Sequence, residues 1–320
     1  MANDVYVVIE HLRGKVSEIS YVMLAAGRDL VDSSNKLNAV LLGSGAESLA
    51  ADLAADQVLY FDDPNLADFT PDAYVNCLKQ LIVTEQPRAV LFGHTSIGME
   101  VANILSIKSH IPLVSSCIQF SSDGGSQMFT SQLYGGKILV EGDLPSPTTL
   151  LTVVPGGYKV EDGQSSTTPS ITKVGIPDLQ DLKVKVTKYI EPEAGDIDIT
   201  TQDLLIAVGR GVQMEDNIEL AEELAEVLSG VVCASRPVVD QGWMPTTRLV
   251  GKSGFQVKPK VYIALGISGA PEHTEGIAGS DTIIAINTDP AAPIFNIARY
   301  GVVEDLLDLV PLLTEKIEAG

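Results

Sequence analysis

Short strand-like runs of β-branched and apolar residues alternate with helical patterns along most of this 320-residue sequence. In the first half, runs such as "NAVLLGS" and "RAVLFGHTS" alternate with helical stretches such as "PDAYVNCLKQLIV" and "MEVANILSIKS". Alternation of this kind is typical of right-handed βαβ crossovers, which place successive strands parallel in one sheet. The sequence therefore predicts the α/β class.

Two segments interrupt this alternation. After Ile118, "QMFTSQLYGGKILVEGDL" and "TTLLTVVPGGY" predict strands joined by glycine turns, added antiparallel to the edge of the first sheet. The next tract, from about residue 155 to 192, is rich in Ser, Thr, Pro and Gly and predicts a connector. We therefore expect two domains, 1–192 and 193–320, each a mainly parallel sheet flanked by helices, with the second one Rossmann-like.

The charge and the cysteines argue against several classes of protein. With 21 Lys and Arg against 42 Asp and Glu, the formal net charge of −21 repels the phosphates of nucleic acids and anionic lipids. No apolar run reaches the roughly 20 residues of a membrane-spanning helix, and the N-terminus lacks a secretion-signal pattern. The spacing of Cys77, Cys117 and Cys233 matches no metal site, and we expect all three to be small buried residues. We expect a cytoplasmic protein that neither binds nucleic acid nor inserts into a membrane.

Four of the strand-like runs end in turns that contain glycine. They are "LLGSGAE", "VLFGHTS", "IAVGRG" and "IALGISGA". Because ligands of parallel sheets bind at the carboxyl ends of strands, these positions favour a nucleotide-type ligand, although a single such turn is more often only a tight connection. Gly209-Arg210-Gly211 lacks the third glycine of the dinucleotide fingerprint. In "GHTSIG", Ser96 is one position out of register for a nucleophile elbow, so we interpret His94 as a structural histidine.

Polar residues that suit a redox cofactor follow the strands of the second domain. They are Ser235 and Arg236 after "VVCA", Lys252 and Ser253 in "VGKSG", and His273 at the end of "GISGAPEH". A flavin ring must be held by hydrogen bonds at its N5 and C2=O edges, and nearby charges set its redox potential. An arginine guanidinium over the ring and a histidine at the C2=O edge would both favour the anionic reduced or semiquinone forms. The hydroxyl group of Ser253 could donate to N5.

A series of motifs runs in order from Leu204 to Pro311: "GRG", "SRPVVDQGW", "VGKSG", "PKVYIALGISGAPEH", "SDTIIAIN", "DPAAPIF" and "YGVVEDLLDLVP". The first domain adds "VLFGHTSIGMEVANILS" and "YGGK". With these motifs the sequence resembles the electron transfer flavoprotein alpha subunits. The resemblance implies an alpha chain that binds FAD in its C-terminal domain. It also implies that the N-terminal domain packs against a beta subunit, which carries AMP or a second FAD.

The same resemblance implies a redox role without substrate turnover by the chain itself. Electrons would pass from acyl-CoA dehydrogenases, as in fatty acid beta-oxidation, or from similar flavoenzymes, to a membrane quinone oxidoreductase. Residue by residue, the family's FAD contacts would fall on Arg210, Ser235, Arg236, Val250, Gly251, Lys252, Ser253, Ser268, Gly269, Ala270, Pro271, Glu272, His273, Asn287, Asp305 and Leu306. Arg236, Ser253 and His273 would tune the flavin, Asn287 and Asp305 would serve its adenosine end, and no metal is implied.

Several positions depart from the family pattern, among them Pro271, which with Glu272 replaces the more familiar Ile-Gln pair. The loop "VGKSG" more often reads V-G-Q-T-G, so Lys252 adds a positive charge while Ser253 keeps the hydroxyl. Glu272 adds a carboxylate where a neutral residue is more familiar, and these two charges would either pair with each other or shift the flavin potential. Arg299 stands where many members have an acidic residue, which predicts an altered docking surface more than an altered flavin site.

Three other functions are open on the sequence. Some family members bifurcate electrons from NADH with a second FAD in the beta subunit, and "SRPVVDQGW" is compatible with that subgroup. In such a complex the chain would be catalytic only as a subunit. A nicotinamide-dependent dehydrogenase would need a complete glycine fingerprint and an acid/base pair, which the sequence does not present. The third is a regulatory nucleotide-binding domain, which would show no reversible flavin reduction.

Overall fold

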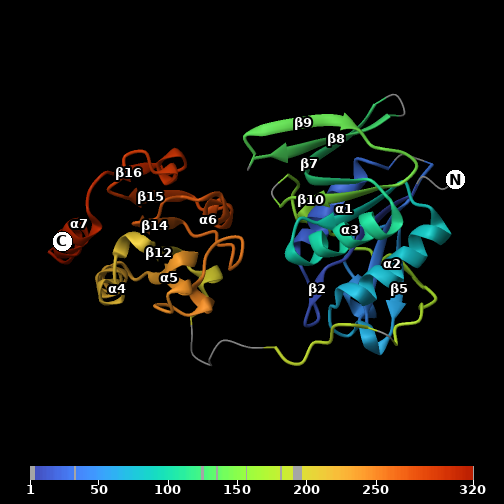
Figure 1. Ribbon diagram of the computed structural model, residues 1–320, viewed down its shortest axis with the longest axis horizontal. Helices are drawn as coiled ribbons and strands as arrows, with labels where there is room; N and C mark the ends of the chain where they lie inside the picture. The colour runs from blue at the N-terminus through green and yellow to red at the C-terminus, as the bar shows by residue number, and fades with distance from the viewer. Residues whose placement is uncertain are drawn as a thin grey trace. The chain divides into compact units, whose positions relative to one another are not determined.

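The computed structural model describes residues 4–31, 34–123, 126–134, 136–155, 157–180, 182–189 and 197–319. The chain divides into two compact units, Met1–Tyr189 and Ile190–Gly320, which we describe separately (Figure 1). The expected domain boundary between residues 192 and 193 lies outside the described residues. Each unit contains a largely parallel sheet flanked by helices, so the predicted α/β class is confirmed.

The first unit is built on a nine-stranded sheet of order β11-β5-β4-β1-β6-β10-β7-β8-β9. Its strands are β1 (Val5–Val8), β4 (Leu37–Gly43), β5 (Gln57–Asp62), β6 (Ala89–Gly93), β7 (Leu113–Asp123), β8 (Ser126–Leu133), β9 (Ile138–Asp143), β10 (Thr149–Val153) and β11 (Ser170–Lys173). The pairs from β11 to β7 are parallel, whereas β7–β8 and β8–β9 are antiparallel. A small hairpin of β2 (His11–Leu12) and β3 (Lys15–Val16) follows β1.

Helices cover both faces of this sheet. They are α1 (Glu18–Arg28), α2 (Pro71–Glu85) and α3 (Ser96–Ser109). Successive side chains of a strand point to opposite faces. Val5 and Val7 therefore join the core under α1, while Tyr6 and Val8 join the core under α2 and α3. Because both faces are covered, the central strands are apolar along their whole length.

Two segments of the first unit differ from the sequence-based prediction. β8 and β9 form the predicted antiparallel edge. β10, however, lies between β6 and β7 and is parallel to both, so its predicted place in the antiparallel edge was wrong. All its residues are buried, which suits a strand covered on both faces. The predicted connector contains η3 (Glu161–Gly163) and β11, and β11 extends the other edge of the sheet by pairing with β5.

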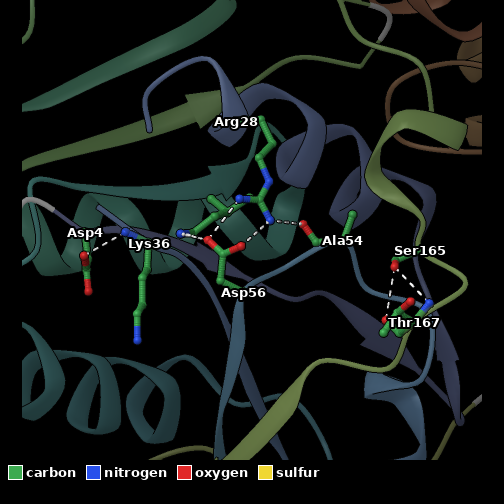
Figure 2. Close-up of polar contacts among 8 residues, drawn as sticks. Asp4, Arg28, Lys36, Ala54, Asp56, Ser165 and Thr167 are labelled. Carbon is green, nitrogen blue, oxygen red and sulfur yellow. Dashed lines mark hydrogen bonds and ion pairs between the residues drawn. The ribbon is translucent and has the colours of Figure 1, made fainter. Parts of the chain in front are cut away.

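A salt bridge ties helix α1 to the sheet of the first unit. Figure 2 shows the Arg28 guanidinium between the Asp56 carboxylate, at 2.9 Å, and the Ala54 carbonyl, at 3.1 Å. Asp56 also accepts the main-chain N–H of Leu37 at 2.8 Å. Burial alone would raise the pKa of Asp56, but these hydrogen bonds outweigh it and hold the pKa below its usual value. The contact fixes the end of α1 against the starts of β4 and β5.

The second unit has a five-stranded parallel sheet of order β13-β12-β14-β15-β16. The strands are β12 (Leu204–Val208), β13 (Val231–Ala234), β14 (Val261–Leu265), β15 (Thr282–Ile286) and β16 (Tyr300–Val302). The α-helices are α4 (Ile218–Leu228), α5 (Arg236–Asp240), α6 (Pro271–Thr274) and α7 (Leu306–Glu318). α4 and α7 pack together over one face of the sheet. The other face is covered by the 249–257 segment and by two short 3-10 helices, η8 (Glu275–Ile277) and η9 (Pro293–Asn296).

The three cysteines are packing residues. Cys77, Cys117 and Cys233 are all buried and unbridged, as predicted. Burial raises the pKa of each thiol to about 12, so the thiols stay protonated at neutral pH. Among the helices of the described ranges, none combines the length and the hydrophobicity needed to cross a bilayer.

Candidate functional site

A cavity of about 790 Å³ opens at the carboxyl ends of the parallel strands in the second unit. That volume falls within the roughly 300–1,000 Å³ of typical ligand sites. The chain leaves β12 on one side for β13 and reaches β14 on the other, so the cavity lies at the switch point of the sheet. The lining residues are Arg210, Gly211, Ser235, Arg236, Pro237, Val250, Gly251, Lys252, Ser253, Gly266, Ile267, Ser268, Ala270, Glu272, His273 and Asn287.

Two glycine turns meet closely at this switch point. The Gly211 N–H donates to the Gly266 carbonyl at 3.1 Å, and a Cβ atom at Gly209 would collide with the same carbonyl. Gly266 has a φ of +62°, a left-handed conformation that glycine adopts without strain. Larger residues would push the ends of β12 and β14 apart. The glycines of "GRG" and "LGISG" therefore shape this side of the cavity.

Three cationic side chains line the cavity, in a chain whose net charge is −21. They belong to Arg210 after β12, Arg236 at the start of α5, and Lys252. Arg236 Nε donates to Asp240 Oδ1 at 2.6 Å, and Lys252 Nζ lies 3.8 Å from Glu275 Oε2. The carboxylates moderate the positive charge without cancelling it. The cavity therefore suits an anionic ligand such as a pyrophosphate.

The loop that carries Lys252 is braced against helix α6. The Lys252 N–H donates to the Glu272 carbonyl at 2.7 Å, and a Cβ atom at Gly251 would lie 2.8 Å from that same carbonyl oxygen. The two backbones are therefore in direct contact, which only a residue without a side chain permits. Ser253 follows in this loop with an exposed side chain. Ser253 therefore lines the cavity from a loop whose backbone is held.

His273 on α6 lines the cavity but is only 7% exposed. Its Nε2 lies 2.9 Å from the hydroxyl oxygen of Tyr262 on β14, while its Nδ1 is buried and has no hydrogen-bond partner among the described residues. Burial lowers the pKa of His273 to about 4, although the main chain of Val250 opposes this shift. The imidazole is therefore neutral at pH 7. The side chain therefore acts as a neutral hydrogen-bonding group.

The donor set of this cavity fits FAD. Buried polar atoms without a partner are rare and cost about 1–3 kcal/mol, so the Nδ1 atom of His273 calls for a partner from outside the chain. A ring carbonyl of a flavin is such a partner if Nδ1 carries the proton. The cations suit the pyrophosphate, and the exposed hydroxyl of Ser253 suits a ring nitrogen. Side chains suited to the pyrophosphate and to the ring of FAD thus line one cavity.

Most of the residues assigned to FAD by resemblance line this cavity. The exceptions are Gly269, Pro271, Asp305 and Leu306. Gly269 packs against the Ile294 backbone with a φ of +85°, and Leu306 packs against Gly266 just behind the cavity wall. The Asp305 carboxylate caps α7 by accepting the Leu307 N–H at 2.9 Å.

Asn287 lines the cavity with a carboxamide that already has partners in the chain. Its Nδ2 donates to the Ile267 carbonyl and its Oδ1 accepts the Asp289 N–H, each at 2.9 Å. These bonds hold the exits of β14 and β15 together. They leave one donor and one lone pair of the carboxamide for a ligand.

Several residues of the site escaped sequence reasoning. Three residues outside the lining contact residues of the lining. Asp240 pairs with Arg236, and Glu275 lies near Lys252. The hydroxyl of Tyr262 lies beside the ring of His273. The spacing of four residues between Arg236 and Asp240 could have indicated their contact, because side chains at this spacing meet on a helix. No such spacing indicates the contacts of Glu275 and Tyr262. Pro237 and Ile267 also line the cavity, as neighbours of predicted residues, while Gly211 and Gly266 line it from the glycine turns that the sequence indicates.

In the first unit, His94 has the structural role that the sequence predicted. Its Nδ1 lies 3.0 Å from the hydroxyl oxygen of Thr152 on β10. The side chain of Thr95 caps α3 by accepting the Gly98 N–H at 3.0 Å, and Ser96 is the first residue of that helix. The segment "GHTSIG" is therefore a strand-to-helix turn.

Two family models match the chain. The model described as "Electron transfer flavoprotein domain" matches residues 5–179, and the one described as "Electron transfer flavoprotein FAD-binding domain" matches residues 198–278. The second match contains the loop and helix that hold Lys252 and His273.

Curated relatives match over nearly their whole length. "Electron transfer flavoprotein subunit alpha" from Bacillus subtilis is 34% identical over 99% of this chain and 98% of the relative. "Protein FixB" from Clostridium saccharobutylicum is 35% identical over 97% and 94%. "Acryloyl-CoA reductase electron transfer subunit beta" from Anaerotignum propionicum is 32% identical over 99% and 96%.

Proposed function

Because the chain belongs to the electron transfer flavoprotein alpha subunit family, we propose that it is the alpha subunit of a heterodimer that carries electrons between flavoenzymes. The second unit would bind FAD in the cavity at the switch point of its sheet. The first unit would pack against a beta subunit that holds AMP or a second FAD. Electrons would enter from acyl-CoA dehydrogenases or similar flavoenzymes and leave to a membrane quinone oxidoreductase.

The observation that carries this proposal is the composition of the cavity. Three cationic residues, Ser253 and His273, whose buried Nδ1 has no partner among the described residues, line one cavity at the carboxyl ends of parallel strands. A nicotinamide-dependent dehydrogenase is less well supported, because the Gly209-Arg210-Gly211 turn leads into the short η5 (Arg210–Val212) and the long helix α4 begins only at Ile218.

Each side chain would have a separate task when FAD is bound. FAD supplies the capacity to take up and release electrons singly. Arg210 and Lys252 would hold the anionic part of the cofactor, and Arg236 would lie over the ring, where its charge favours the reduced form. The hydroxyl of Ser253 would donate to N5. His273 would meet the C2=O edge as a neutral donor, because its burial keeps a second proton off the ring.

Uptake of FAD is the direct test of this function. The full chain is produced together with its beta subunit, and FAD is counted per heterodimer and titrated back after removal. We expect Arg210→Glu, which reverses a charge in the cavity, to weaken FAD binding at least about tenfold, or about 1.4 kcal/mol. Lys260→Glu makes the same change at an exposed site outside the cavity and should bind FAD like the wild type. A wild-type heterodimer that takes up no FAD overturns the proposal.

A second candidate follows from the relative named as an electron transfer subunit of acryloyl-CoA reductase. In this alternative the chain belongs to an NADH-dependent complex that bifurcates electrons. It predicts two FAD molecules per heterodimer and oxidation of NADH. One FAD with one tightly held AMP, and no reaction with NADH, would exclude it.

A further inference from the structure

Tyr262 stands directly behind His273 and is the residue that holds its ring. Tyr262 lies on β14, is 0% exposed, and its hydroxyl oxygen is 2.9 Å from Nε2 of His273. We propose that Tyr262 is a positioning residue: its hydroxyl donates to Nε2 and so keeps the only proton of the neutral imidazole on Nδ1, facing the cofactor. This inference deepens the proposed function and rests on it.

The direction of the Tyr262–His273 hydrogen bond follows from the other side of the ring. The main chain of Val250 lies beside His273 and acts in favour of a proton on the ring, as a carbonyl oxygen does. Because Nε2 already faces the Tyr262 hydroxyl, this effect acts at Nδ1, although Nδ1 makes no hydrogen bond of regular geometry within the described chain, and the proton is therefore placed on Nδ1. Nε2 must then be the acceptor, and the hydroxyl group of Tyr262 must be the donor.

The functional consequence is whether His273 offers the flavin a hydrogen-bond donor or a lone pair. With Nδ1 protonated and Nε2 occupied, His273 offers one neutral N–H donor to the cofactor. With the opposite tautomer it would offer a lone pair, which would repel a carbonyl oxygen and disfavour negative charge on the reduced ring. The phenol therefore decides whether this histidine supports or opposes reduction.

The tautomer can be measured without any cofactor. In long-range ¹H–¹⁵N NMR spectra of the FAD-free full chain, with His273 assigned by His273→Ala, we expect Nδ1 protonated and Nε2 bare in the wild type. Tyr262→Phe should lower the ratio of the Nδ1–H to the Nε2–H form about fivefold, the factor of one ordinary hydrogen bond. Tyr74→Phe removes another buried hydroxyl, in the first unit, and should leave this ratio unchanged. A wild-type ring protonated on Nε2 overturns the inference.

A double-mutant cycle on the FAD-loaded heterodimer tests the effect on the cofactor. Tyr262→Phe should lower the one-electron potential of FAD by less than His273→Ala does. In the His273→Ala background, Tyr262→Phe should produce no further shift, because the phenol acts only through the imidazole. An equal shift in both backgrounds would assign Tyr262 a merely structural role. If the wild type takes up no FAD, the proposed function fails while the NMR measurement still decides the tautomer.

Discussion

Lys252 Nζ lies 3.8 Å from the carboxylate of Glu275, three residues beyond the Glu272 that the sequence suggested as its partner. Lys252 meets Glu272 only through its main-chain N–H, which donates to the Glu272 carbonyl. The side chains of Lys252 and Glu275 are 41% and 35% exposed, so their pairing contributes no more than about 1 kcal/mol. The positive charge that distinguishes this loop is therefore screened but not removed.

The first prediction concerns the sign of that charge. Lys252→Gln should lower the one-electron potential of bound FAD, and Glu275→Gln should raise it, because the reduced flavin is the more negative form. Each shift should be below about 59 mV, which corresponds to a tenfold change in the relative affinity for the two redox states. Lys260→Gln breaks an exposed ion pair with Asp203 outside the cavity and should leave the potential unchanged. Spectroelectrochemical titration measures all three, and shifts of equal sign at Lys252 and Glu275 would contradict the charge argument.

Arg236 is expected to have the larger effect on the flavin. Arg236→Ala should lower the potential of FAD, because a cation assigned to the ring is lost, and Arg236→Lys should restore part of it. Asp240→Asn should raise the potential, since Asp240 now accepts from Arg236 Nε at 2.6 Å. The same titration applies. If Arg236→Ala and Arg236→Lys give the same potential, charge at this position is not what tunes the flavin.

His273 should make the second unit sensitive to acid. Its pKa is about 4 in the folded chain against an ordinary value of 6.5, so between these values the unfolded chain takes up a proton that the folded chain does not. Stability is therefore full above pH 6.5 and is lost as pH falls toward 4, by up to about 3 kcal/mol.

The measurement for this acid effect is urea unfolding at pH 7 and pH 4.5. The fluorescence of Trp243, the only tryptophan, reports on the second unit. His273→Gln should lose less stability between these pH values than the wild type does. His110→Asn, at an exposed position of the first unit, serves as the control. Parallel pH curves for His273→Gln and the wild type would show that His273 is not the group responsible.

Two glycines with similar positive φ values allow a matched test of packing at the site. Gly269 and Gly242 have φ values of +85° and +77°, but a Cβ atom at Gly269 would collide with the Ile294 backbone, whereas Gly242 faces open space. Gly242→Ala should cost about 1–2 kcal/mol from backbone strain alone. Gly269→Ala should cost about 1–3 kcal/mol more and weaken FAD binding, because η9 must move. Far-UV circular dichroism in urea measures both, and equal costs would rule out the steric term.

The fold class and the location of the site were accessible to local reasoning. The periodicity that distinguishes strands from helices is determined by neighbouring residues. Once the parallel strands are identified, the positions of their carboxyl ends along the sequence are known as well. Hence the sequence predicts that "IAVGRG", "VVCASR" and "IALGISG" surround one crevice, and the structure brings them together there. The resemblance to a family added the individual residues, of which Asp305 proved to be a helix cap outside the lining.

What the sequence could not decide depends on positions that are distant along the chain. The run "TTLLTVV" reads equally well as an edge or a central strand, and only the burial of both of its faces places β10 inside the sheet. The local pattern sets which segments form strands and which residue types reach the carboxyl ends. Only the tertiary structure decides that Tyr262 contacts His273 and that Lys252 contacts Glu275. Each contact joins two segments that are separate along the chain, and the packing of their backbones brings the side chains together.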